Sequence, residues 1–404
     1  KQLQQNKARH FHNLLTKTYN QVGCYPIGQL DFFELFATNS FCCYKNCLSL
    51  FVTSNINISN MKKLLAFLAL LIFSTSFAGT AKANGTAKEK PQLVIFETDM
   101  GNDIDDALAL DLLYKYMDQG KIKLLAIMTN KEGASSAHFI DIMNTWYGYP
   151  KIPIGIVRNG AECKHPNDYT LAVSDMKANG KPAFKTSVKD VTKLPDAEQL
   201  YRKILSKQPD HSVVIISVGF STNLARLLDT RPDSYSSLNG RELIKKKVKL
   251  FSLMAGNFDQ RHLTEYNVVK DIAACAKLFK ESPIPIVTSP FELGEAVQYP
   301  GKSIENDFGW TTRHPMVEAY KAYAKMPYDR PTWDLTAVLE VLEPGKFMTQ
   351  SPKGTIVVDE KGHTDFTQEA NGLHSYLTIT PEQGRRIRQF FVGTIPQKAK
   401  CVKD

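Results

Sequence analysis

The segment that decides the fold runs from Leu93 to Leu110 and reads LVIFETDMGNDIDDALAL. Its first four residues are apolar and predict a buried strand, whereas the stretch from Ala107 onward predicts a helix. Five acidic residues occupy the ten positions from Glu97 to Asp106, where the strand ends and the helix begins. In open α/β sheets, ligands bind at the carboxyl ends of the strands. The segment therefore predicts a ligand site at one end of a sheet.

The acidic residues of this segment also indicate the kind of site. Carboxylates this close together repel one another, and a hard cation with oxygen ligands relieves the repulsion. A simpler interpretation is a solvated loop in which Asp105 caps the helix and Asp106 interacts with the helix dipole. One or two acids would fit that interpretation, but five beside a buried strand favour a metal site or an acid–base site.

Residues 61–83 have the pattern of a secretory signal peptide. They begin with Met-Lys-Lys, continue with an apolar run over 64–73 and end in Ala-Lys-Ala. This order of charge, apolar core and small residues is typical of an export signal, and the apolar run is too short for a stable membrane anchor. We expect cleavage after Ala83, with Gly79 as the alternative, and an exported protein that is periplasmic or secreted.

The segment before this signal is interpreted differently from the rest of the chain. A working signal peptide stands at the start of a protein, so we interpret residues 1–60 as non-native upstream translation that precedes the natural start at Met61. The alternative is a small disulfide domain, because this segment holds four cysteines. The predicted mature domain covers residues 84–404.

Charge and cysteine content exclude several classes of function. The formal net charge of +9 falls to +3 for residues 84–404, because the first 83 residues carry a net charge of +6. Such a small charge gives no reason to expect a nucleic-acid partner. The cysteines left, Cys163, Cys275 and Cys401, have spacings that fit neither a disulfide framework nor a zinc site. Cys275 lies in an apolar helical stretch and is predicted to be a core residue.

Strand-like and helix-like segments alternate along the mature chain. This alternation predicts an α/β fold with a mostly parallel sheet and helices on both faces. The predicted strands cover 92–96, 123–128, 153–157, 212–218, 247–254 and 284–288. The predicted helices lie near 105–117, 135–147, 197–207, 222–229, 266–280, 314–325 and 333–342. Residues 158–196 are expected to cross the sheet edge, residues 354–378 to form late antiparallel strands, and Thr380-Pro381 to open a final helix.

Polar residues that a site could use follow several of the predicted strands or open helices. In chain order these residues are Asn130, Thr222, Asn223, Glu265, Asn267 and Asp334. Met254 and Trp333, which are not polar in the same sense, stand beside them and are included as candidates. Taken alone, Thr222, Asn223 and Asp334 are explained more simply as helix caps, Glu265 and Asn267 as surface residues and Trp333 as a packing residue. Their common place at the strand ends is what suggests a site.

Taken together, these motifs resemble the inosine/uridine-preferring nucleoside hydrolase family from about Leu93 to Leu342. The matching motifs are the acidic cluster, Asn130 after the second strand, GFSTN at 219–223, MAG at 254–256, EYNV at 265–268 and WD at 333–334. The resemblance implies a single Rossmann-like α/β domain. It also implies hydrolysis of the N-glycosidic bond of ribonucleosides or related ribosides to ribose and free base, as in purine and pyrimidine salvage.

The resemblance further implies a cofactor and site residues. Ca²⁺ would be held by Asp99, Asp105, Asp106, Asp334 and the backbone carbonyl of Thr222. Asp99 would also act as general base toward a metal-bound water. Contacts to substrate would come from Asn130, Met254, Glu265, Asn267 and Trp333. The implied partner is a small nucleoside or riboside, and assembly into a homo-oligomer stays open.

Two departures from the family pattern concern the acidic cluster. The spacing from Asp99 to Asp105 is two residues longer than usual in the family, so Asp103 is an alternative to Asp105 as the metal ligand. Glu97 stands where the first acid is commonly aspartate. An acid two residues before Asp99 also suggests a Mg²⁺ phosphohydrolase of the haloacid dehalogenase type, but that mechanism needs an aspartate nucleophile at this position.

A third departure concerns the leaving group. Trp333 replaces a histidine that the family often uses to protonate the departing base, and an indole N–H is only a hydrogen-bond donor. We therefore predict weak turnover of inosine and uridine and better turnover of activated ribosides such as p-nitrophenyl riboside, unless His314 or His374 supplies the proton. A non-catalytic nucleoside- or sugar-binding protein is the remaining alternative; it would need no metal.

Overall fold

The computed structural model describes residues 90–161 and 168–402. The predicted signal peptide and the segment before it lie outside the described residues. Within the two described ranges, no helix is long and apolar enough to cross a membrane.

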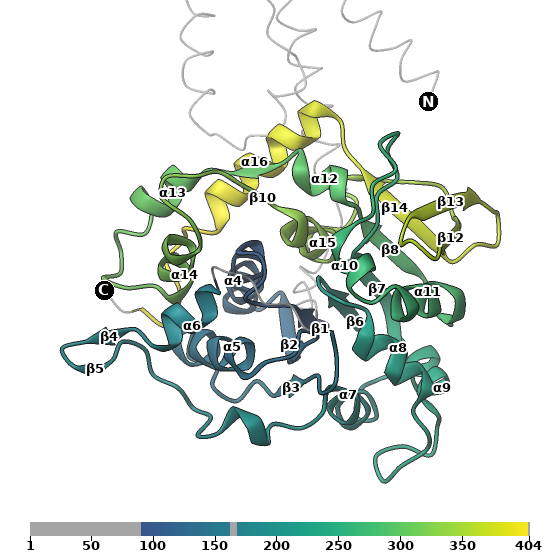
Figure 1. The fold of residues 1–404 in the computed structure, drawn as a ribbon, viewed down its shortest axis with the longest axis horizontal. Helices are drawn as coiled ribbons and strands as arrows, with labels where there is room; N and C mark the ends of the chain where they lie inside the picture. The colour runs from purple at the N-terminus through teal and green to yellow at the C-terminus, as the bar shows by residue number, and fades with distance from the viewer. Residues whose placement is uncertain (1–89, 162–167, 403–404) are drawn as a thin grey trace, which may run out of the picture. The chain divides into compact units, whose positions relative to one another are not determined.

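A ten-stranded sheet runs through the middle of the described chain (Figure 1). Its strands are β1 (Gln92–Thr98), β2 (Ile122–Thr129), β3 (Ile154–Ile156), β6 (Val213–Ser217), β7 (Val248–Met254), β8 (Ile286–Ser289), β11 (Thr349–Gln350), β12 (Gly354–Val358), β13 (Thr364–Gln368) and β14 (His374–Thr378). The order β14-β8-β7-β6-β1-β2-β3 is parallel throughout. β12 and β13 extend the sheet with antiparallel pairing, and β11 pairs with β14. The predicted parallel sheet with late antiparallel strands is confirmed.

Helices surround this sheet and connect its strands. They are α4 (Asp105–Asp118), α5 (Ala134–Trp146), α6 (Tyr169–Ser174), α7 (Ala197–Leu205), α8 (Thr222–Asp229), α9 (Gly240–Lys247), α10 (Tyr266–Lys270), α11 (Ile272–Glu281), α12 (Phe291–Glu295), α13 (Gly301–Asn306), α14 (Pro315–Tyr323), α15 (Trp333–Leu342) and α16 (Pro381–Thr394). In the part of the chain that the structure describes, two short antiparallel pairs lie outside the main sheet: β4 (Lys177–Ala178) with β5 (Lys181–Pro182), and β9 (Gln298–Tyr299) with β10 (Arg330–Pro331). The polar stretch 158–196 contains α6, β4, β5 and a short 3₁₀ turn, η2 (Val191–Lys193).

Apolar side chains of the central strands point alternately to the two faces of the sheet. In β1, Val94 and Phe96 join the core under α4, α5, α14 and α15, whereas Ile95 joins the core under α7, α8, α9 and α11. This alternation follows from the two-residue period of a strand. A strand covered on both faces needs apolar residues at every position, which is why β1 reads as a continuous apolar run.

One predicted helix is divided in the structure. The sequence predicts a single helix over 266–280, but α10 ends at Lys270 and α11 begins at Ile272. Between them Asp271 has an extended φ of −149°, and its side chain accepts a hydrogen bond from the Ala274 N–H at 3.2 Å. Asp271 therefore caps a new helix, because a free aspartate oxygen satisfies the N–H groups of a first turn. By contrast, the predicted start of the last helix at Thr380 is confirmed, with a capping box to Gln383.

The strand order also defines where a ligand can bind. From β1 the chain continues to β2 and β3 on one side, whereas β6, β7 and β8 lie on the other side. The side on which the chain adds strands therefore reverses between β1 and β6, and such a switch point leaves a crevice at the carboxyl ends of the two strands. Asp99 directly follows β1, and Val218 directly follows β6.

Candidate active site

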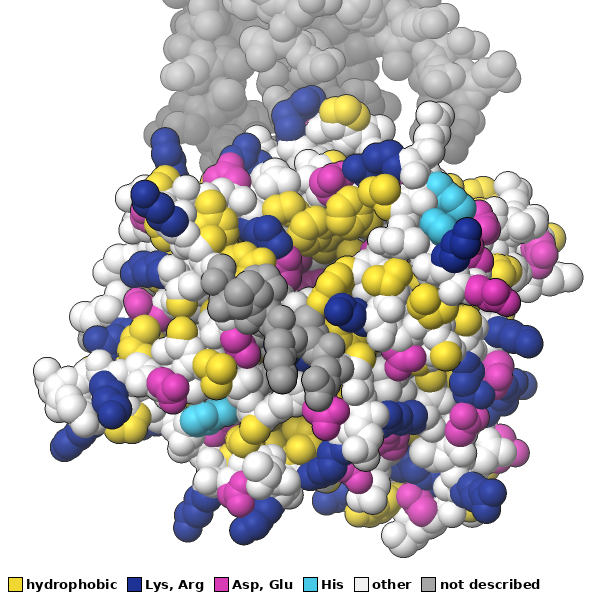
Figure 2. All heavy atoms as spheres, viewed as in Figure 1, with side chains coloured by type: hydrophobic (Ala, Val, Ile, Leu, Met, Phe, Trp, Pro, Cys, Tyr) yellow, Lys and Arg dark blue, Asp and Glu magenta, His cyan; other side chains and the backbone are white. Residues whose placement is uncertain are grey.

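A cavity of about 270 Å³ lies at this switch point. Figure 2 shows acidic side chains near the centre of this face, beside a strip of hydrophobic side chains. The residues that line the cavity are Asp99, Asn102, Asp103, Asp105, Asp106, Val218, Met254, Glu265, Tyr266, Asn267, Phe291, Tyr323, Arg330, Trp333 and Asp334. The structure thus brings most of the predicted site residues to one place.

Three aspartates form a compact cluster in this cavity. Asp105 and Asp106 open α4, and Asp334 lies in the first turn of α15; one carboxylate oxygen from each lies within 4.8 Å of the others. The backbone N–H of Asp334 donates to Asp105 Oδ2 at 2.9 Å, and the Thr98 hydroxyl donates to Asp106 Oδ1. The other oxygen of Asp106 is buried and has no hydrogen-bond partner among the described residues.

The electrostatics of this cluster favour a bound cation. Burial raises the pKa of Asp105, Asp106 and Asp334 well above the usual range, and repulsion between neighbouring carboxylates adds to the shift. A cation between them would restore the charged form. Oxygen ligands are those that Ca²⁺ and Mg²⁺ prefer. The donor set and the unpartnered oxygen of Asp106 therefore fit a hard divalent cation.

Asp103 lies outside this cluster. It forms a two-point ion pair with Arg330, in which Nε donates to Oδ1 at 2.8 Å and Nη2 donates to Oδ2. Arg330 belongs to β10, three residues before α15. Asp105, and not Asp103, therefore stands with Asp106 and Asp334.

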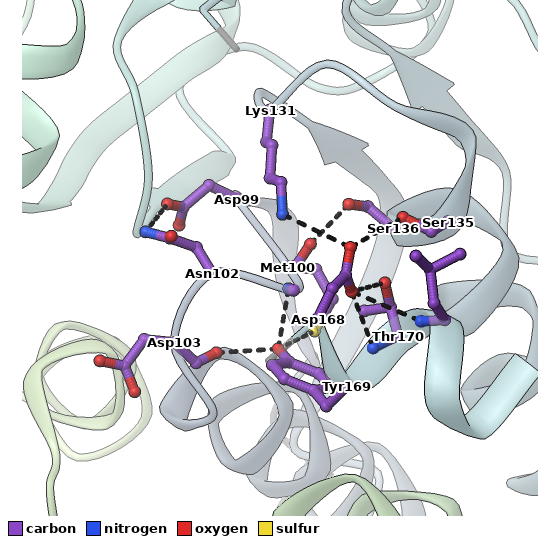
Figure 3. Close-up of polar contacts among 12 residues, drawn as sticks. Asp99, Met100, Asn102, Asp103, Lys131, Ser135, Ser136, Asp168, Tyr169 and Thr170 are labelled. Atoms are coloured by element: carbon purple, nitrogen blue, oxygen red, sulfur yellow. Dashed lines mark hydrogen bonds and ion pairs between the residues drawn. The ribbon is translucent and has the colours of Figure 1, made fainter. Parts of the chain in front are cut away.

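The loop between β1 and α4 is held by a tyrosine from the polar excursion (Figure 3). The Tyr169 hydroxyl accepts a hydrogen bond from the Gly101 N–H at 2.9 Å and donates to the carbonyl of Asp103 at 2.8 Å. Asn102 Nδ2 donates to Asp99 Oδ2 at 3.1 Å. Two side chains that sequence reasoning did not single out thus order the acidic loop around Asp99.

Lys131 is a third residue to which the sequence analysis assigned no role (Figure 3). Its side chain is only 4% exposed, and its Nζ lies 4.0 Å from Asp168 Oδ2. Burial raises the pKa of Asp99 to about 7, and the Lys131 charge opposes that shift. A lysine two residues after the end of a buried strand is the sequence signal that could have pointed to Lys131, because a buried lysine needs a charged partner.

Glu265, Asn267 and Met254 form the opposite side of the cavity. Glu265 accepts hydrogen bonds from the backbone N–H groups of Asn267 at 2.8 Å and Val268 at 3.2 Å. Asn267 Nδ2 donates to the carbonyls of Val218 and Met254, both at 3.1 Å. Burial raises the pKa of Glu265 to about 7. These contacts fix both polar side chains on backbone groups, so they present a rigid wall to a ligand.

Two predicted site residues do not line the cavity. Asn130 is fully buried, and its side-chain amide has no hydrogen-bond partner among the described residues. It packs under Gly219, where a Cβ atom would overlap the Asn130 Oδ1. Thr222 begins α8, and its hydroxyl donates to Asp271 Oδ2 at 2.5 Å. The substrate contact of Asn130 and the metal ligation by the Thr222 carbonyl stay predictions.

The side of the cavity that holds Trp333 is aromatic. Trp333 stacks on Phe291 with ring centroids 5.4 Å apart, and its indole N–H donates to the Phe291 carbonyl at 2.9 Å. That N–H is therefore already used within the protein. His314 lies buried with its Nε2 3.4 Å from Asp111, and His374 accepts from the Ile356 N–H at 2.9 Å. Neither histidine lines the cavity.

The sequence matches the family model described as inosine-uridine preferring nucleoside hydrolase over residues 94–383. The chain belongs to this family. As a nucleoside hydrolase it is an N-ribosyl hydrolase, so the phosphohydrolase and non-catalytic alternatives are not supported. The structure agrees, because Glu97 does not line the cavity and instead accepts hydrogen bonds from Tyr201 and Asn223 at 2.9 and 2.7 Å.

Solved structures show the same fold. A plant nucleoside hydrolase, PpNRh1, is 18% identical with a TM-score of 0.56, covering 76% of this chain and 98% of that one. A purine-preferring ribonucleoside hydrolase from Gardnerella vaginalis is 16% identical with a TM-score of 0.57, covering 76% and 99%. An inosine-uridine preferring nucleoside hydrolase from Bacillus anthracis is 16% identical with a TM-score of 0.53, covering 75% and 99%. Among curated protein sequences, none matches this nucleoside hydrolase.

Proposed function

We propose that this nucleoside hydrolase cleaves ribosides in a Ca²⁺-dependent reaction in which Asp99 is the general base. The observation that carries the proposal is the meeting of Asp99 with the cluster of Asp105, Asp106 and Asp334 in one cavity. The three clustered carboxylates would hold the ion, and Asp99 borders the same space. When bound, Ca²⁺ lowers the pKa of a water molecule beside it and offsets the charge of the carboxylates.

Asp99 is suited to accept the proton of the attacking water. Burial raises the pKa of this carboxyl, and a cation bound beside it would favour the charged form, which is the form that accepts a proton. Asn102 holds one of its oxygens at 3.1 Å, which leaves the other oxygen for the water. Removal of the water proton develops the nucleophile that bonds to the anomeric carbon.

Glu265 and Asn267 are proposed to hold the ribose hydroxyls. Both side chains line the cavity and are anchored by backbone groups. A carboxylate and an amide can accept hydrogen bonds from two adjacent hydroxyls, and fixed acceptors let binding energy orient the sugar. The aglycone would then lie toward Trp333 and Phe291.

The experiment is a measurement of ribose release from a panel of nucleosides and p-nitrophenyl riboside. We expect Asp99→Asn to lower kcat by about 10²–10⁴-fold, and chelation to abolish turnover until Ca²⁺ is restored. Asp365→Asn is the matched control, because this exposed carboxylate lies outside the cavity and pairs with His262 at 3.2 Å. Wild-type turnover by Asp99→Asn would contradict the assigned base. Full turnover after chelation would contradict the metal requirement.

We further propose that the protein is exported by the signal at 61–83. The support is the sequence pattern alone, since these residues lie outside the described ranges. Amino-terminal mass spectrometry of the protein from its native host should find a first residue near Asn84. A native protein that retains residues 61–83 would contradict export with cleavage.

A further inference from the structure

The cavity contains a positive charge that the proposed reaction does not yet use. Arg330 is the only lysine, arginine or histidine among the described residues that line the cavity. Its side chain is 25% exposed. Every other charged residue of the described lining is acidic, so this guanidinium is the one cationic side chain there.

Arg330 is held rigidly from several sides. Asp103 binds it through two hydrogen bonds, Nε to Oδ1 at 2.8 Å and Nη2 to Oδ2. The guanidinium carbon lies 5.2 Å from the ring centroid of Tyr323 and 5.3 Å from that of Trp333, within the range of a cation–π contact. The remaining amino group, Nη1, makes no hydrogen bond among the described residues. An arginine fixed in this way keeps two N–H donors for a ligand beside Trp333.

The neighbouring groups of the aromatic side are poor proton donors. The Trp333 N–H donates to the Phe291 carbonyl. Burial raises the pKa of Tyr323 to about 12. Among the described residues of this part of the cavity, Arg330 is the one placed to stabilise negative charge that develops on an aglycone, through hydrogen bonds from its guanidinium.

We propose that Arg330 is a catalytic residue that stabilises the aglycone as it departs as an anion, so that the substrates are ribosides with acidic aglycones. This inference rests on the proposed hydrolase function. In the step, the bond from the anomeric carbon to the aglycone breaks and its electron pair stays on the aglycone. The water oxygen bonds to the anomeric carbon, and its proton goes to Asp99. The aglycone anion is held by Nη1 of Arg330 and takes a proton from solvent after release.

The test uses a graded series of substrates: 2,4-dinitrophenyl, 4-nitrophenyl and phenyl riboside, together with uridine. The wild-type protein and Arg330→Met are compared in the full chain with Ca²⁺ present. We expect Arg330→Met to lower kcat/KM about 100-fold for phenyl riboside and uridine but only a few-fold for 2,4-dinitrophenyl riboside. The reason is that a good leaving group carries its negative charge without help. The slope of log kcat/KM against leaving-group pKa should therefore become steeper.

Control variants separate this role from a structural one. Arg388→Met removes an arginine that is half exposed on α16, 3.6 Å from Asp329 and outside the cavity, and should leave the slope unchanged. Arg330→Lys keeps the positive charge, so its kcat/KM for substrates with poor leaving groups should lie between those of Arg330→Met and the wild type. If Arg330→Met does not fold, Arg330→Gln, which is neutral but still a hydrogen-bond donor to Asp103, replaces it in the same comparison.

Two results would count against the proposals, and they differ. An equal loss on all four substrates, with the slope unchanged, would overturn the role of Arg330 and leave the hydrolase function intact. Failure of the wild-type protein to hydrolyse any of the ribosides would contradict the proposed function itself. A steeper slope in Arg330→Met with an unchanged slope in Arg388→Met would support the inference.

Discussion

Asp103 and Asp105 are two residues apart, yet their side chains have different partners. Asp105 lies in the first turn of α4 and faces the start of α15, where the Asp334 N–H donates to it. Asp103 precedes the helix and pairs with Arg330. The helix start therefore separates a carboxylate that can bind a metal from one that is already hydrogen-bonded to a guanidinium.

Calcium binding should follow this separation. We expect Asp105→Asn to weaken Ca²⁺ affinity more than about 100-fold. Replacing a residue that only supports a metal ligand typically lowers metal affinity by roughly 10–100-fold, and removing a ligand itself costs more. Asp103→Asn should change the affinity less than about tenfold. Isothermal titration of the metal-free protein measures both. Loss of Ca²⁺ binding in Asp103→Asn with retention in Asp105→Asn would reverse the assignment of the ligand.

Trp333 gives a second prediction for a single residue. Its N–H is used by the Phe291 carbonyl, so it offers no proton to a departing base. Trp333→His introduces a group that titrates near neutral pH, and general acids contribute about 10²–10⁴-fold where they are well placed. We expect inosine hydrolysis to rise about tenfold relative to p-nitrophenyl riboside. Steady-state kinetics of the wild type and the variant on the two substrates measure this change. The prediction would be refuted if the wild-type protein hydrolysed inosine rapidly and Trp333→His left that rate unchanged.

At the scale of elements, the pairing of α4 with α15 creates the metal cluster. Both helices cover the same face of the sheet, and their first turns meet above the carboxyl ends of the strands. Acidic residues in a first turn also interact favourably with the helix dipole, which offsets part of the cost of burying them. The same helix α15 carries another buried acid, Glu340, two turns further on.

Glu340 provides a prediction about pH and stability. Burial raises its pKa from 4.5 to about 7, and its Oε2 has no hydrogen-bond partner among the described residues. The folded state therefore holds this proton more tightly than the unfolded state between these two values. The free energy of unfolding falls as pH rises through that window, and the full penalty is present above about pH 7.

Glu340→Gln removes this penalty because glutamine carries no charge. We expect the variant to be more stable than the wild type by about 1–2 kcal/mol at alkaline pH, after allowance for solvent screening, and equally stable at or below the ordinary glutamate pKa. Urea unfolding at both pH values measures the difference. Glu305→Gln, an exposed glutamate on α13, is the control. A variant that gains nothing at alkaline pH would show that Glu340 ionises without cost.

At the scale of the whole molecule, one sheet positions every part of the site. The switch between β1 and β6 opens the crevice, β7 brings Met254, and segments that follow β7 and β8 bring Glu265 and Trp333. Residues from Asp99 to Asp334 contribute to a single cavity. A domain of this kind must therefore fold as a whole before the site exists.

The predicted mature domain yields a test at this scale. Residues Lys88–Asp404 form one unit by their internal contacts. A protein that starts at Asn84 should fold, show the same Tm as the full chain and retain full Ca²⁺-dependent turnover, because all lining residues lie beyond that point. Calorimetry and ribose release measure this. Loss of turnover in the shortened protein, or peptides from 1–60 in the native protein, would contradict the predicted boundaries.

Much of this fold could be predicted from the sequence because its signals are local. The apolar run of β1 and the Thr380-Pro381 start of α16 each depend on neighbours a few residues away. The acidic segment at the end of β1 indicated a cation site for the same reason, since five carboxylates in ten positions repel one another wherever the chain goes. The helix boundary at Asp271 was not predicted, because the sequence alone does not distinguish an aspartate that caps a helix from one inside a helix. The backbone conformation is needed to tell them apart.

The pairings across the cavity depended on packing between distant segments. Asp105 and Asp334 are 229 positions apart, and Asp103 and Arg330 are 227 apart. No periodicity or local propensity specifies such contacts, because they follow from the way α4 and α15 pack on one face of the sheet. The same packing placed Asn130 under Gly219, where it does not line the cavity, and engaged the Trp333 N–H with a backbone carbonyl. The sequence thus determined the residues available for chemistry, and the tertiary structure determined which of them meet.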